Sequence, residues 1–232
     1  KKIYSKETKY IITIHNPHLQ PRKGIKGKLM NYLTRILNNK ILELSKKKKN
    51  IFIHLHSENQ KPNVELKYIY AKHPISNKYS EYKKITFTKI NEPISFLFIG
   101  NLHYYKGVDI FINSIKHLDK SYRDKCNFTI AGKGDIKIPE EIKKITTIYN
   151  YFLSDQQFLE IMEKTHIIVL PYREATQSGI LSFAVSLNKP VIITNVGNLS
   201  EYVLHMNTGI ILNKLSYEDL INSYKYFIRN PN

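Results

Sequence analysis

The sequence predicts an α/β fold built on parallel sheets, with a complete second domain preceded by part of a first one. Short β-branched or aromatic runs recur along the chain, and helical stretches separate them. A polar segment at 75–93, without apolar periodicity, interrupts the alternation once. Strands alternating with helices favour parallel sheets, and the interruption favours two domains.

Eight runs have the composition of buried strands. In chain order they are YIITI (10–14), IFIHL (51–55), KYIYA (67–71), ISFLFI (94–99), NFTIA (127–131), HIIVL (166–170), PVIIT (190–194) and GIIL (209–212). Between strands, apolar residues at helical spacing line one face of each of two segments. These are Val108, Phe111, Ile112 and Ile115 in one segment, and Leu29, Leu33, Ile36, Leu37, Ile41 and Leu44 in the other.

A strand and helix series restarts at Ile94, after the polar segment, so we place a domain boundary near residue 88. Residues 1–88 then form a partial first domain and residues 89–232 a second one. The first part has about three strands and one long helix, too few for a doubly wound domain covered on both faces. Because the chain also begins at Lys1 without an initiator Met, we expect part of the first domain to lie upstream.

The positive charge belongs to one half of the chain. Of the net +17, residues 1–90 carry +16 (21 Lys/Arg against 5 Asp/Glu) and residues 91–232 carry +1 (15 against 14). Such a field attracts nucleic acid, anionic lipid headgroups or phosphorylated substrates alike, so its sign does not choose among them. A solvated lysine-rich face is the alternative without function.

Composition excludes several classes of protein. The chain is globular, with 232 residues and 42% hydrophobic composition. A single cysteine, Cys126, excludes disulfides and a cysteine-based zinc site, and we expect it to be part of the core. The sequence has no apolar run of about 18 residues and no signal peptide pattern, so we expect a cytoplasmic protein.

The first candidate binding loop follows the strand ISFLFI. The segment GNLHYYKG (100–107) leads from that strand into the helix that starts near Val108. Gly100 suits a tight loop, free backbone N–H groups at a helix start favour phosphate, and Lys106 supplies a full positive charge. Many α/β loops contain glycine and lysine, so the pattern alone is weakly specific.

The second candidate loop follows the strand HIIVL. Glu174 is a lone carboxylate there, and the residues Thr176, Gln177, Ser178 and Gly179 suit a helix start. In an open parallel sheet, ligands bind outside the carboxyl ends of the strands, so a diphosphate between the two loops is physically reasonable. The alternative is that Thr176 and Ser178 only cap their helix.

Three segments resemble a known family. GNLHYYKGVDIFI, LPYREATQSGILSFAVSLNKPVIITNVGNLSEYV and, upstream, TIHNPHLQP are similar to the retaining glycosyltransferases of family 4, which have the GT-B fold. The similarity spans about 125 residues of the second domain. It implies two Rossmann-like domains and metal-free transfer of a sugar from a nucleoside diphosphate sugar of the UDP or GDP type, with no further cofactor.

The resemblance also implies roles for individual residues. Lys106 matches the lysine that neutralises the donor diphosphate, and Glu174 matches the first glutamate of a paired-glutamate motif, which holds the transferred sugar. Gly179 and Ile180 match backbone that cradles phosphate. His15 matches the histidine that faces the reacting sugar.

Some positions depart from the family pattern. Asn101 replaces the basic residue after the first glycine, with His103 as a substitute. Phe183 or Ser182 stands where the second glutamate of the family is expected to bind ribose, so the carboxylate expected for ribose recognition is missing at this position. Asn198 replaces a glycine of a V-G-G turn, and because asparagine tolerates positive φ we expect it to serve the same backbone.

Weaker candidates remain. His54 and His56 share a strand face, as two metal ligands would, but the sequence shows no third ligand. GKGD (132–135) lacks the phosphate-loop spacing and predicts a turn. Tyr149 and Tyr151 are candidates for stacking on the nucleobase.

The leading hypothesis is a glycosyltransferase of surface polysaccharide or glycolipid synthesis, whose basic first half docks on the inner membrane face. Its partners would be a nucleotide sugar and a glycan or lipid-linked acceptor. One alternative is a basic nucleic-acid-binding module, although no groove-reading motif accompanies the basic residues. Another is a nucleotide-sugar-binding partner without activity. The sequence leaves the sugar, base, acceptor and oligomeric state open.

Overall fold

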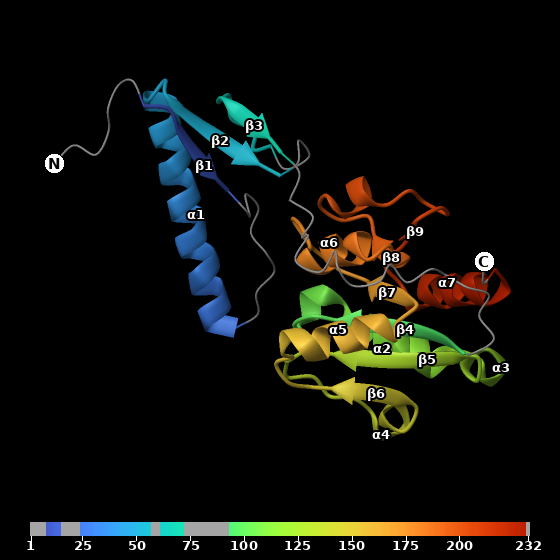
Figure 1. The fold of residues 1–232 in the computed structure, drawn as a ribbon. Helices are drawn as coiled ribbons and strands as arrows, with labels where there is room; N and C mark the ends of the chain where they lie inside the picture. Colours follow the sequence, from blue (N-terminus) through green and yellow to red (C-terminus); the bar gives the residue numbers. More distant parts are fainter. Residues whose placement is uncertain (1–7, 15–23, 57–60, 72–92, 231–232) are drawn as a thin grey trace. The chain divides into compact units, whose positions relative to one another are not determined.

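The computed structural model describes residues 8–14, 24–56, 61–71 and 93–230 (Figure 1). The chain divides into two compact units, residues 1–74 with 174–177 and residues 75–173 with 178–232. The boundary expected near residue 88 lies outside the described residues, so the division into 1–88 and 89–232 stays a prediction.

The first unit contains one parallel sheet and one long helix. Strands β1 (Tyr10–Thr13), β2 (Ile51–Leu55) and β3 (Tyr68–Tyr70) pair in the order β1-β2-β3, and α1 (Gly24–Lys47) connects β1 to β2. These are the strands and the helix expected from the sequence. Burial alternates along β2, so the side chains of Ile53 and Leu55 lie on its buried face, where they form a small core with Ile14.

Helix α1 turns only part of its apolar surface toward that core. Ile41 and Leu42 pack against it. Leu29, Leu33, Leu37 and Leu44 are 47–59% exposed. The predicted helix is confirmed, but all four leucines of its predicted apolar face are exposed to solvent. Neither α1 nor any other helix in the described part of the chain has the length and apolar composition of a membrane span.

The second unit is built on a six-stranded, wholly parallel sheet. Its strands are β4 (Ile94–Ile99), β5 (Cys126–Ala131), β6 (Thr146–Tyr149), β7 (Ile167–Leu170), β8 (Val191–Thr194) and β9 (Gly209–Leu212). Its α-helices are α2 (Val108–His117), α3 (Lys120–Arg123), α4 (Glu140–Lys143), α5 (Asp155–Glu163), α6 (Gly179–Ser186) and α7 (Tyr217–Arg229). Two short 3-10 helices complete it, η2 (Tyr104–Lys106) and η3 (Leu199–Tyr202).

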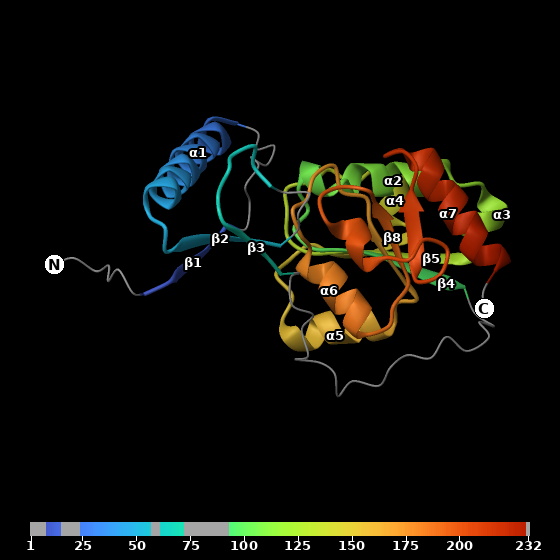
Figure 2. The ribbon, with the colours of Figure 1, turned by 90° about the horizontal axis from the view of Figure 1, so that it is seen from above.

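Helices cover both faces of this sheet, with α2, α4 and α7 on one face and α5 and α6 on the other (Figure 2). The strands are therefore nearly continuous apolar runs, as strands buried on both sides must be. Phe96, Phe98 and Phe128 pack with Phe111 of α2 and Tyr224 of α7 in the larger core. The result is a fixed platform for the loops at the carboxyl edge.

The strand order β6-β5-β4-β7-β8-β9 places a topological switch point between β4 and β7. From β4 the chain proceeds outward through β5 to β6, and from β7 it proceeds the other way through β8 to β9. Ligands of doubly wound sheets bind in the crevice at the carboxyl ends of the two strands where this order reverses. The loops after β4 and β7 are the two candidate binding loops of the sequence.

All eight predicted strands exist, with bounds shifted by at most one residue at each end. Strand β6 was missed, because TTIY is a short edge strand directly after the short helix α4 and does not stand out as an apolar run. A turn was predicted over GKGD, and the structure has a bend at Gly132, directly after β5.

Candidate functional site

The first loop runs from β4 through η2 into α2 and is held tightly against the second. Gly107, at the junction of η2 and α2, has φ of 71°, a backbone conformation that favours glycine. A Cβ atom at this position would overlap the carbonyl oxygen of Pro171, directly after β7. The first loop can therefore approach the second this closely only with glycine at residue 107.

The second loop runs from β7 to α6, whose N-terminus is capped but open to solvent. Ser178 is the N-cap, and its Oγ accepts a hydrogen bond from the backbone N–H of Leu181 at 3.3 Å. Gly179 is exposed, and a Cβ added there would have no neighbour within 4 Å. A Cβ on Gly100 would lie 3.9 Å from Cγ1 of Ile180, so the first loop reaches the start of α6. Free N–H groups at such a helix start favour an anion.

Lys106 lies between the two loops as a half-buried cation. Its Nζ is 3.7 Å from the ring centroid of Tyr172, which is fully buried, and 5.4 Å from that of Tyr105. Burial lowers the pKa of Lys106 to about 8. Within the described part of the chain, no carboxylate forms an ion pair with it. A desolvated ammonium group without a counter-ion is what an anionic ligand would stabilise.

Tyr172 extends the contact of Lys106 into the second loop. Its hydroxyl lies 3.3 Å from Oγ of Ser178, and its carbonyl accepts a hydrogen bond from Thr194 Oγ1 of β8 at 2.6 Å. Burial raises the pKa of the Tyr172 hydroxyl. The ring therefore stays neutral and offers its face to the ammonium group.

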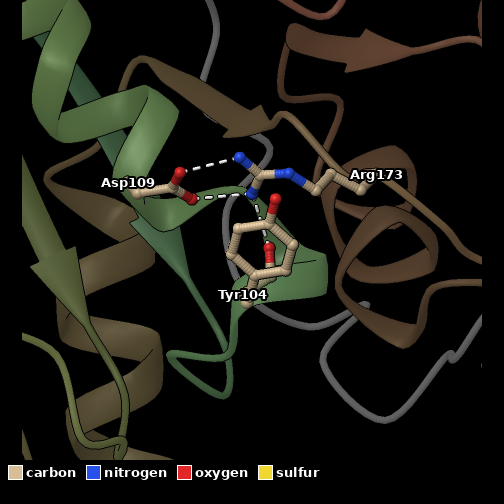
Figure 3. Close-up of polar contacts among 3 residues, drawn as sticks. All are labelled: Tyr104, Asp109 and Arg173. Carbon is tan, nitrogen blue, oxygen red and sulfur yellow. Dashed lines mark hydrogen bonds and ion pairs between the residues drawn. The ribbon is translucent and has the colours of Figure 1, made fainter. Parts of the chain in front are cut away.

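Arg173 joins the two loops directly (Figure 3). Its guanidinium donates two hydrogen bonds of 2.7 Å to the two carboxylate oxygens of Asp109, in the first turn of α2. It also donates to the carbonyl of Tyr104 at 2.6 Å and lies 3.8 Å from the centroid of that ring. The Arg173 N–H donates to the carbonyl of Tyr105 at 2.8 Å. These contacts, the Arg173 clamp, hold η2 and the start of α2 in the first loop against Arg173 in the second loop.

Most of the predicted binding residues lie on the two loops at the switch point. Lys106 contacts Tyr172, whose hydroxyl contacts Ser178, and Gly100 lies near Ile180, which follows Gly179 in α6. His103 lies on the same first loop, exposed, with its ring stacked on Tyr105 at 5.9 Å.

The remaining predicted residues are Glu174, Gln177 and His15. Glu174 is exposed and Gln177 half-buried, both on the second loop. His15 lies outside the described residues. None of the contacts found here tests the roles assigned to Glu174 and His15, which stay predictions.

The positions that depart from the family pattern have structural roles of their own. Phe183 is half-buried against Phe158 of α5, with centroids 5.3 Å apart, and Ser182 donates to the carbonyl of Ser178 at 3.3 Å. The expected positive φ at Asn198 is wrong, because its φ is −106° and Gly197 takes the positive value of 57°. Asn198 is instead fully buried.

The weaker candidates have structural contacts. His54 bonds Thr13 Oγ1 at 3.0 Å, and both His54 and His56 lie 3.3 Å from the carbonyl of Ala71, so the pair ties the strands of the first sheet together. Among the described residues, no group of three His, Cys, Asp or Glu could hold a metal ion. Cys126 is half-buried beside the larger core, and burial raises its pKa to about 12.

The Arg173 clamp and the contact between Lys106 and Tyr172 were not predicted from the sequence. Arg173 and Asp109 lie 64 residues apart, and no pattern in either segment indicates that the two side chains pair. The one hint of a pairing was the position of Asp109 at a helix start, but a favourable interaction with the helix dipole also explains an acidic residue there.

The second unit matches a known family. A model described as glycosyl transferases group 1 matches residues 93–230. An uncharacterized glycosyltransferase of Methanocaldococcus jannaschii is 31% identical over 139 residues, which cover 58% of this chain and 38% of that protein. The alpha-D-kanosaminyltransferase of Streptomyces kanamyceticus is 21% identical over 142 residues, covering 58% and 36%. The chain thus matches well under two thirds of the length of these relatives.

Solved glycosyltransferases share the fold. WaaG, a glycosyltransferase involved in lipopolysaccharide biosynthesis, superposes with a TM-score of 0.70 at 17% identity, covering 90% of this chain and 62% of that one. HepE of Anabaena, solved in complex with UDP-glucose, gives 0.63 at 16% identity, covering 96% and 63%. The predicted GT-B architecture is confirmed.

Proposed function

The chain belongs to the group 1 family of glycosyl transferases, and from this membership we propose that it transfers a sugar from a nucleoside diphosphate sugar to an acceptor with retention of configuration. The observation that carries the proposal is Lys106. It is a half-buried cation without a carboxylate partner among the described residues, on the loop at the switch point of the sheet, and the Tyr172 ring that it contacts reaches the N-cap Ser178 of α6. HepE, a structural neighbour, binds UDP-glucose, which supports a donor of the UDP or GDP type.

In the proposed reaction, the bond between the sugar and the diphosphate breaks and negative charge develops on the leaving diphosphate. Lys106 and the backbone N–H groups at the start of α6 stabilise that charge in place, without a metal ion. Glu174 is assigned to the hydroxyls of the transferred sugar and His15 to the face of the reacting carbon. The acceptor attacks from the face that the diphosphate leaves, and the leaving phosphate takes its proton.

The wider assignment is a surface polysaccharide or glycolipid pathway at the cytoplasmic face of the membrane, where a glycan or lipid-linked acceptor is met. The family match gives no support to a nucleic-acid-binding module. A nucleotide-sugar-binding partner without activity would show donor binding and no transfer.

A thermal unfolding screen with UDP, GDP, ADP and their sugars tests the proposal. A ligand at 100 times its dissociation constant stabilises the fold by about 2.7 kcal/mol, which gives a clear shift of the melting temperature. No shift with any of these compounds would contradict donor binding.

The role of Glu174 has its own test. Glu174→Gln should leave nucleoside diphosphate affinity nearly unchanged and weaken binding of the complete sugar nucleotide, because only the latter carries the hydroxyls. Glu163→Gln, an exposed carboxylate on α5, is the matched control. Equal losses for both ligands would assign Glu174 to the nucleotide instead.

A further inference from the structure

Lys106 is the last residue of η2, and Arg173 holds the backbone of the two residues before it. The backbone N–H of Arg173 donates to the carbonyl of Tyr105 at 2.8 Å, and its guanidinium donates to the carbonyl of Tyr104 at 2.6 Å (Figure 3). The Tyr104 carbonyl also accepts a hydrogen bond from the N–H of Gly107 at 3.0 Å, which closes the turn. The conformation of η2 therefore depends on Arg173 as well as on its own turn.

The guanidinium of Arg173 is itself fixed in place. Both carboxylate oxygens of Asp109 accept from it at 2.7 Å, and the ring centroid of Tyr104 lies 3.8 Å away. The Arg173 side chain is 20% exposed. A planar guanidinium in a bidentate pair has one favourable orientation, so it cannot leave the Tyr104 carbonyl without also straining charged hydrogen bonds. The Arg173 clamp thus resists any change in η2.

The end of the Lys106 side chain depends on this fixed backbone. Its ammonium group lies 3.7 Å from the ring centroid of Tyr172, the residue directly before Arg173, in a half-buried position. Removing an ammonium group from water costs free energy, and a lysine side chain regains rotamer freedom when it returns to water. A loose η2 would allow that return. A backbone held against the second loop opposes it.

A role limited to stability is the alternative. Asp109 is in the first turn of α2, so its pair with Arg173 would tie this helix to the second loop whether or not Lys106 had a task. The chain offers a pair of that plain kind for comparison. Lys225 of α7 donates to the carboxylate of Asp119, the N-cap of α3, at 3.1 Å. Loss of that pair affects stability without releasing η2.

We propose that Arg173 is a positioning residue of the donor site, which holds the carbonyls of Tyr104 and Tyr105 and thereby keeps the ammonium group of Lys106 on the ring of Tyr172. The role is exerted through Lys106 rather than through a contact of Arg173 with the donor. The proposal rests on the proposed binding of a nucleoside diphosphate sugar, but the position of Lys106 can be measured without any donor.

The first measurement is the pKa of Lys106 in the free protein, followed by NMR of the whole chain with 13C-labelled lysine, in which Lys106→Ala identifies the signal. The titratable groups whose rings face the ammonium group are Tyr172 and Tyr105, and burial lowers the pKa of Lys106 to about 8. In Arg173→Ala the side chain returns to water, so we expect this pKa to rise by about 1–2 pH units, toward the ordinary lysine value. Arg173→Lys restores one charged donor without the bidentate fork and should give an intermediate rise.

The sign of the change in Asp109→Ala separates positioning from a direct effect of charge. Removal of this carboxylate leaves the charge of Arg173 uncompensated, which by itself would lower the pKa of Lys106. Release of the clamp raises that pKa instead, because the ammonium group regains water. Asp119→Ala, which breaks the pair with Lys225, is the matched control and should leave the pKa of Lys106 unchanged. Circular dichroism of each variant verifies that the fold is retained.

The second measurement is the affinity for UDP and GDP by calorimetry at pH 7, where Lys106 is charged in the natural chain and in the clamp variants. Arg173→Ala should weaken binding of the preferred nucleotide by about three- to thirtyfold, and Asp119→Ala should leave it unchanged. Added to Lys106→Ala, the substitution Arg173→Ala should cause little further loss, because the two residues act through one ammonium group.

Two outcomes overturn the proposal. One is a pKa of Lys106 that stays near 8 or falls in both Arg173→Ala and Asp109→Ala. The other is an affinity loss from Arg173→Ala that persists in full when residue 106 is already alanine, which would mean that Arg173 acts on the nucleotide independently of Lys106. A raised pKa in both clamp variants of a chain that binds neither UDP nor GDP would uphold the positioning of Lys106 and overturn the proposed function.

Discussion

The two units bury their apolar side chains to different degrees. In the second unit, helices cover both faces of a six-stranded sheet, and the central strands are almost wholly buried. In the first unit, a three-stranded sheet meets one described helix, α1, and Leu29, Leu33, Leu37 and Leu44 of this helix (the leucine row) are exposed. The covered sheet of the second unit therefore holds the two candidate binding loops in fixed positions, whereas α1 leaves much of its apolar surface open to solvent in this chain.

The largest expected effect tests this difference directly. Leu97→Ala, at a fully buried position of β4, should lower the free energy of unfolding by about 2–5 kcal/mol, because it leaves a cavity. Leu37→Ala, at a position that is 59% exposed, should change it by less than about 0.5 kcal/mol. Urea unfolding of both variants measures this. Comparable losses would mean that the leucine row of α1 is buried in solution.

Substitutions at two glycines, one in each loop, test how closely the loops pack and where the phosphate would bind. Gly107→Ala places a Cβ on a positive-φ residue and against the Pro171 carbonyl, so a loss of about 2–4 kcal/mol in unfolding free energy is expected. Gly179→Ala has open space and lies in a helix, so stability should stay equal or rise by up to about 1 kcal/mol. Donor affinity should nonetheless fall in Gly179→Ala, because the methyl group would occupy the space assigned to phosphate. Unchanged affinity, measured by calorimetry, would move the phosphate away from α6.

The Arg173 clamp should contribute less to the free energy of unfolding than the buried Leu97 or Gly107. Arg173→Ala should lower the free energy of unfolding by about 1–2 kcal/mol, because bidentate charged hydrogen bonds are stronger than ordinary surface pairs. A double-mutant cycle with Asp109→Asn isolates the coupling, expected near 1 kcal/mol. Additive effects of the two substitutions would show that the pair does not tie the loops together in solution.

The sequence predicted the strands of both sheets because buried parallel strands read as continuous apolar runs. It also predicted both binding loops, since each combines a strand end, a glycine or small polar residue and a helix start. It missed β6, whose short edge strand has no such run. The Arg173 clamp depends on a contact between segments 64 residues apart, which no local pattern encodes.

The exposed face of α1 shows a second limit of prediction from the sequence. Helical periodicity identifies which residues share a face, but it does not say whether that face meets the protein or something else. The positive φ expected at Asn198 was wrong, because the neighbouring Gly197 adopts the left-handed conformation instead.

The pKa of Lys106 predicts the pH dependence of donor binding. Burial lowers that pKa to about 8, so in the free protein Lys106 loses its proton as the pH rises through 8. A bound diphosphate favours the charged form and raises the pKa, so binding takes up a proton above pH 8. Affinity should be nearly constant below pH 7 and fall by up to about tenfold per pH unit above 8. Calorimetry in two buffers of different ionisation enthalpy detects the proton uptake, which should be absent in Lys106→Ala.

Calorimetric titration of UDP and GDP into the natural chain, Lys106→Ala and Lys116→Ala tests the central claim most directly. Lys116 is an exposed lysine of α2, paired with Glu141 at 3.6 Å, and serves as the control. We expect Lys106→Ala to weaken binding of the preferred nucleotide by about 1.5–3 kcal/mol, since it removes a charged hydrogen-bond donor, and Lys116→Ala to leave it unchanged. Equal affinity of the natural chain and Lys106→Ala would contradict the assignment of Lys106 to the donor diphosphate.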